Sequence, residues 1–153
     1  MKNISKIALA LILCAGGGSY LSAAQGAAAT LQIDPSVEKN VYAAQKVVDA
    51  WLALIDQGKY AASYDNASLK MQVSIPRDEW AKSVESWRRP LGTIVSRNIA
   101  DIRVAENPPG MPAGQYLVFV YQSNFRNKSN VTELVTLLQT DSGEWRVLTY
   151  HLK

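Results

Sequence analysis

A single histidine, His151, restricts the chemistry that this sequence can support. It rules out a metal site built from two or more histidines, and the carboxylates do not cluster as a carboxylate-only site requires. A Ser-His-Asp triad would have to use His151, and no Gly-x-Ser-x-Gly turn is present to position a serine. Asp101 and His151 are the only candidate proton carriers, and His151 is more simply interpreted as an ordinary strand residue. We therefore expect no catalytic residue, metal or cofactor, with a small enzyme using Asp101 or His151 as the alternative.

Five residues are candidates for holding a ligand. Arg88, Arg89 and Arg97 lie within ten residues of sequence and could form an anion site. Trp51 and Trp87 could line a pocket for an apolar ligand. Each set also has a purely structural interpretation. Arginines suit the end of a helix and a surface ion pair, and tryptophans at helical spacing usually belong to the core.

The first 24 residues have the pattern of an export signal. Two lysines precede an apolar run of nine residues, and small residues at positions 22 and 24 suit a signal peptidase. The run is far shorter than the ~20 apolar residues that a membrane-spanning helix needs. The sequence therefore predicts cleavage after Ala24, a periplasmic or secreted location, and no membrane span in the mature chain.

Removal of this signal changes what the composition implies. The only cysteine, Cys14, leaves with it, so disulfides and thiolate chemistry are excluded from the mature chain. The formal charge of +3 includes Lys2 and Lys6, and the remaining chain has 14 basic and 13 acidic residues. We see no basic run, and we therefore expect no nucleic-acid partner.

The mature chain is predicted to form one domain, residues 34–153, after a tether at residues 25–33. Apolar residues recur at steps of three and four in its first part and alternate in parts of its second, which indicates helices followed by strands. We expect a long helix that opens with Asp34 as its cap and ends before Gly58. Two further helices are expected at residues 60–69 and 74–89, and four strands at residues 93–105, 115–125, 131–140 and 145–152.

This order of elements predicts an α+β fold. Three N-terminal helices would be followed by a four-stranded antiparallel sheet, and the short connections between strands favour a meander. Such a sheet could wrap the long first helix with its apolar face. The expected arrangement is cone-like, as in nuclear-transport-factor-2-like or cystatin-like folds.

Several short motifs resemble one known family. Arg88-Arg89-Pro90-Leu91-Gly92 followed by Ser96-Arg97 is similar to its Arg-x-Pro-Leu-Gly…Ser-Arg block, and residues 50–60, 114–116 and 145–150 add further matches. Over about residues 41–152 the chain resembles the exported bacterial family catalogued as domain of unknown function 4019. The chain departs from the pattern at Pro76, near the expected start of the third helix. The resemblance implies a periplasmic or secreted location in Gram-negative bacteria, and it implies no activity or catalytic residue.

The sequence thus favours a non-catalytic exported module. Its partner would be an unknown protein or a small ligand, held at the sheet face or at the mouth of the cone. A homodimer formed through the sheet is a further possibility that the sequence leaves open.

Overall fold

The computed structural model describes residues 35–153. The predicted signal peptide (residues 1–24), the tether (residues 25–33) and the helix cap Asp34 lie outside the described residues.

One long helix, α1, begins at Pro35 and ends at Asp56, as predicted. Its buried face repeats every three or four residues through Val48, Trp51 and Ile55, which are at most 2% exposed. Gly58 follows with a positive φ of 71°, the left-handed conformation that commonly ends a helix.

The rest of the helical part differs from the prediction: the expected helix over residues 60–69 ends at residue 65, and a second short helix, which was not predicted, covers residues 69–74. The backbone N–H of Ser68 donates to the Val147 carbonyl oxygen at 2.8 Å, which holds the chain extended between them. Ser68 then caps the second helix by accepting from the Met71 N–H. The predicted start of the next helix at Ser74 is also wrong. Ile75 precedes Pro76 and is extended, as residues before proline usually are, so that helix begins only at Arg77. The observed elements are α2 (Tyr60–Asp65), α3 (Leu69–Ser74), α4 (Arg77–Arg88) and the 3₁₀ turn η1 (Arg89–Leu91).

The sheet matches the prediction closely. Its four antiparallel strands follow the chain in the order β1-β2-β3-β4, which is the expected meander. Each observed strand boundary lies within one residue of the predicted one. The strands are β1 (Ile94–Glu106), β2 (Gln115–Phe125), β3 (Val131–Gln139) and β4 (Trp145–Leu152).

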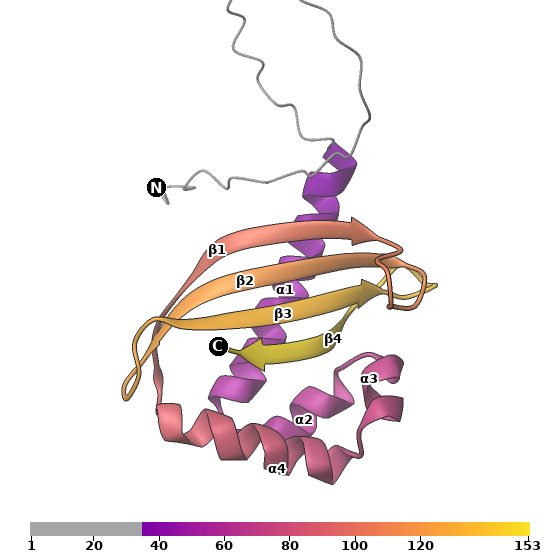
Figure 1. Ribbon diagram of the computed structural model, residues 1–153. Helices are drawn as coiled ribbons and strands as arrows, with labels where there is room; N and C mark the ends of the chain where they lie inside the picture. Colours follow the sequence, from indigo (N-terminus) through magenta and orange to yellow (C-terminus); the bar gives the residue numbers. More distant parts are fainter. Residues whose placement is uncertain (1–34) are drawn as a thin grey trace, which may run out of the picture.

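The inner face of the sheet packs on α1, which crosses it (Figure 1). Alternate residues of the strands point to this face, so Ile102, Phe119, Val135 and Val147 are fully buried in one core with Trp51. The helices α2, α3 and α4 close one side of the core (Figure 1). The α+β fold, with helices before an open four-stranded antiparallel sheet, is therefore confirmed, and the match to either named cone-like fold stays a prediction.

Candidate functional site

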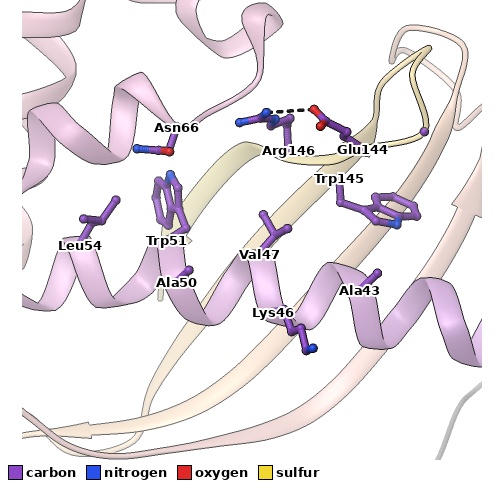
Figure 2. Close-up of a pocket in the computed structure, with 11 residues that line it drawn as sticks. Ala43, Lys46, Val47, Ala50, Trp51, Leu54, Asn66, Glu144, Trp145 and Arg146 are labelled. Atoms are coloured by element: carbon purple, nitrogen blue, oxygen red, sulfur yellow. Dashed lines mark hydrogen bonds and ion pairs between the residues drawn. The ribbon is translucent and has the colours of Figure 1, made fainter.

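A groove of about 510 Å³ lies between α1 and the hairpin that joins β3 to β4. Its floor is the side of α1 that carries Val47, Ala50, Trp51 and Leu54. In Figure 2, Val47 and Trp51 point from α1 toward the space below Asn66 and Arg146, at the start of β4. The groove is therefore lined on one side by aliphatic and aromatic carbon.

The groove exists because the edge of β4 is covered over only part of its length. Ala67 forms a parallel bridge with Val147, and the Ser68 N–H bonds to the Val147 carbonyl. The chain enters this bridge directly from α2 at Asn66 and turns into α3 after Ser68. Within residues 35–153, only this short segment pairs with the edge of β4. The part of the edge beside Trp145 and Arg146 borders the groove.

The polar groups around the groove are mostly neutralised. Arg146 forms an ion pair with Glu144 at 2.9 Å, and both side chains are largely exposed. The Asn66 amide donates to the Ala62 carbonyl oxygen at 2.8 Å. Lys46 points away from the groove in Figure 2, and its ammonium lies 4.6 Å from the centre of the Tyr42 ring. The site therefore favours a ligand that is mainly apolar and carries little charge.

Trp145 separates this groove from a second, smaller cavity. That cavity, of about 80 Å³, lies between the first half of α1 and the sheet, beside Val41, Val104 and Leu117. The Trp145 side chain lines both spaces, is 6% exposed, and its indole N–H has no hydrogen-bond partner among the described residues. Burying an unpaired donor costs roughly 1–3 kcal/mol, and the Trp145 nitrogen is itself buried rather than open to the groove.

The predicted arginines do not converge on the groove. Arg88 and Arg97 instead meet at Asp56, the last residue of α1, at 2.8 Å and 2.7 Å. Arg88 also donates to the Gly92 carbonyl oxygen, and its guanidinium lies 4.2 Å from the centre of the Phe125 ring. Its Nε atom has no partner among the described residues.

Arg97 extends this arrangement to a second carboxylate, Glu133, in the middle of the sheet. Glu133 is completely buried and accepts from Arg97 at 2.7 Å, from the Ser123 hydroxyl at 2.5 Å and from the Tyr150 hydroxyl at 2.5 Å. We call these six residues, Asp56, Arg88, Arg97, Ser123, Glu133 and Tyr150, the charged cluster.

The cluster shifts the pKa of Asp56 and the pKa of Tyr150. Burial alone would raise the pKa of Asp56, but hydrogen bonds from Arg97 and Arg88 lower it below its ordinary value of 3.8. Burial and the neighbouring Glu133 raise the pKa of Tyr150, so this phenol keeps its proton and donates it. The cluster thus contains two arginines and two carboxylates. Arg88 and Arg97, which were predicted to bind an external anion, are already paired with carboxylates of the same protein.

The two predicted tryptophans both pack against Tyr150. The ring centres of Trp51 and Trp87 each lie 5.4 Å from that of Tyr150. The Trp51 indole donates to the Ser63 carbonyl oxygen at 2.8 Å. Of the five predicted ligand-binding residues, Trp51 alone lines the groove; Arg89 lies in a separate surface depression beside α4, 3.4 Å from Glu85.

The two candidate proton carriers lie on the outer face of the sheet, which points away from α1. Asp101 forms an ion pair with Arg103 at 2.7 Å, and His151 is exposed. Neither residue lines either cavity or the depression beside α4.

Another buried titratable group, the Tyr121 hydroxyl, has no hydrogen-bond partner among the described residues.

Two further properties of residues 35–153 bear on the site. None of the helices in this range is both long and apolar enough to cross a membrane. The same range contains no group of three or more histidine, cysteine, aspartate or glutamate residues placed to hold a metal ion.

A family model matches most of the described chain. The model of a family described as a protein of unknown function (DUF4019) matches residues 47–150. This range includes the second part of α1 from Val47, all the later helices and nearly the whole sheet. A search of curated proteins finds no match.

Proposed function

Because the chain belongs to the DUF4019 family, whose function is unknown, we propose a role from its own geometry: an exported module that binds a small, mainly apolar molecule without transforming it. The binding site is the groove between α1 and the β3–β4 hairpin. The location is periplasmic or secreted, which rests on the signal pattern of residues 1–24.

The observation that carries this proposal is the groove itself, with its apolar floor and paired polar groups. A volume of about 510 Å³ lies within the usual range for sites that hold small organic molecules. The floor offers apolar surface from Val47, Ala50, Trp51 and Leu54.

The distribution of charge supports binding rather than catalysis. The four strongly interacting charges of the cluster are used to bind one another. The groove itself holds one exposed ion pair and an amide, and neither has the geometry of a nucleophile activated by a base.

A neutral apolar dye, N-phenyl-1-naphthylamine, tests the groove directly. We expect a saturable rise in its fluorescence with the wild-type protein, because dye bound in the groove is shielded from water. Val47→Arg places a charged side chain in the groove and should weaken dye binding at least tenfold. Val73→Arg is the matched control, because Val73 is 84% exposed on α3 and does not line the groove.

A second variant separates loss of binding from loss of folding. Ala50 is exposed on α1, and Ala50→Trp should fill the groove without disturbing the core. The proposal is contradicted if the wild-type protein shows no saturable dye binding. It is also contradicted if the Val47→Arg and Ala50→Trp variants both bind the dye as tightly as wild type. Native mass spectrometry of protein from its own periplasm tests export and occupancy together, since the mature chain should begin at Gln25 and carry a bound small molecule.

A further inference from the structure

The outer face of the sheet is open over most of its area. No described helix covers it, and Figure 1 shows α1 to α4 on the other side or below. The loop before β2 covers one end, where the Tyr116 hydroxyl donates to the Pro112 carbonyl oxygen at 2.6 Å. From Val118 to Asn124 along β2 the face has no such cover among the described residues.

One row across this open face has an unusual order of side chains. The strand register places Asp101 beside Val120, Val120 beside Leu134, and Leu134 beside His151. A carboxylate therefore lies at one edge, an imidazole at the other, and two aliphatic side chains lie between them. Three steps of ~4.8 Å between strands put Asp101 and His151 about 14 Å apart, so they cannot pair within one chain.

This row is complementary to itself under one particular symmetry. Consider a second copy placed face to face and related by a two-fold axis that runs along the strands between β2 and β3. Each Asp101 then lies opposite the partner's His151, and each Val120 opposite the partner's Leu134. A two-fold axis across the strands would instead place Asp101 against the partner's Asp101, which like charges disfavour.

The neighbouring rows agree with the same axis. Arg103 pairs with Asp101 of its own chain at 2.7 Å and shares its row with Val118, Thr136 and Thr149, so its guanidinium would face an uncharged threonine of the partner. Two aligned sheets whose mean strand directions differ by about 30° are a common way for such faces to pack.

We propose that this face forms a symmetric homodimer. Val120 and Leu134 form the centre of its interface, and Asp101 contacts the partner's His151 at both edges. The open part of the face, seven residues by four strands, measures roughly 24 Å by 19 Å, or about 450 Å² per copy. That area is at the small end of specific interfaces, so the dimer is weak and depends on concentration. This inference is independent of the groove and of any ligand.

Sedimentation velocity of the purified protein, from about 1 µM to about 1 mM, tests the dimer. The mean mass should rise toward that of two chains. Leu134→Asp should abolish the rise because it buries two carboxylates at the centre of the interface. A wild-type protein that stays monomeric throughout overturns the proposal.

Two substitutions at the exposed His151 test the predicted register without endangering the fold. His151→Glu faces the partner's Asp101 with a like charge at both ends, and should weaken the dimer at least tenfold. His151→Lys should bind as tightly as wild type or more so. Ser86→Glu, the same change in charge on the exposed side of α4, should have no effect. Equal dimerisation by His151→Glu and His151→Lys rules out the proposed pairing.

Discussion

The charged cluster at the end of α1 and the groove along its side differ in how completely their polar groups are paired. In the cluster, both oxygens of Asp56 and both oxygens of Glu133 accept from neighbouring side chains. In the groove, the buried Trp145 N–H has no partner in the described part of the chain. Both regions border the same helix, and both place aromatic rings beside polar atoms.

This difference indicates which region is structural. A buried network whose carboxylates are fully paired gains nothing from a ligand, and it fixes the positions of α1, α4 and the sheet relative to one another. A buried donor without a partner is an unfavourable feature, so the edge of the groove at Trp145 is less completely satisfied than the carboxylates of the cluster. Predictions that alter the two regions separately can test this distinction.

The largest effect should follow from removing the central carboxylate of the cluster. Glu133→Ala leaves the Arg97 guanidinium and the Ser123 and Tyr150 hydroxyls without their shared acceptor in the core. Breaking a buried pair from one side typically costs about 3–5 kcal/mol, and we expect a loss of that size in the free energy of unfolding measured in urea.

The exposed pair beside the groove provides the control for this substitution. Glu144→Ala removes a carboxylate from Arg146, where both side chains face water, and should change stability by about 1 kcal/mol or less. Equal losses for the two variants would contradict the structural role assigned to the cluster.

The fold could be predicted where local patterns decide it. The step of three and four residues from Val48 to Ile55 indicated α1, and the alternation in β1 with the turn signals between the strands gave boundaries within one residue. The break between α2 and α3 could not be predicted in this way. It depends on Ser68 pairing with Val147, which lies 79 positions later in the sequence.

The sites were harder to predict because their partners are far apart in sequence. Arg88, Arg89 and Arg97 were predicted together as one anion site, but the proximity of Asp56 and Glu133 to two of them follows only from the tertiary fold. One signal was available: Glu133 lies in phase with the buried Val131, Val135 and Leu137, so an acid on the inner face of β3 needed a cation. The sequence contained no comparable signal for the groove, because the groove forms where the pairing of residues 67–68 with the edge of β4 ends.

A change in stability of intermediate size should distinguish two indoles, that of Trp51 on α1 and that of Trp145 at the start of β4. Trp51→Phe and Trp145→Phe remove the same atoms from two buried sites. The first loses the bond to the Ser63 carbonyl oxygen and should cost about 1–3 kcal/mol beyond the loss of packing. The second removes an unpaired N–H, so its cost should be smaller by at least about 1 kcal/mol in protein stripped of ligand. Thermal or urea unfolding of the two variants measures this difference, and equal costs would mean that the Trp145 N–H is already satisfied.

The smallest effect concerns the pH dependence of stability from two carboxyls of α1. The pKa of Asp56 is lowered in the folded protein, so its contribution is complete above its unfolded pKa and is lost as the pH falls below about 4. The pKa of Asp49 is raised by burial, although the charge of Arg97 opposes the rise. The folded protein holds that proton more tightly, so the contribution of Asp49 is favourable at low pH and is lost as the pH rises through about 4.

The two asparagine variants should therefore change the slope of stability against pH in opposite directions. Between about pH 5 and pH 3, stability should fall less steeply with acid in Asp56→Asn than in wild type, and more steeply in Asp49→Asn. Urea unfolding at a series of pH values gives both slopes, and only the sign relative to wild type is needed. If Asp56→Asn kept the wild-type slope, Asp56 would have the same proton affinity in the folded and unfolded chain. The arginines would then not hold it as an anion, and the contrast between a cluster whose carboxylates are fully paired and an incompletely paired groove would fail at its central residue.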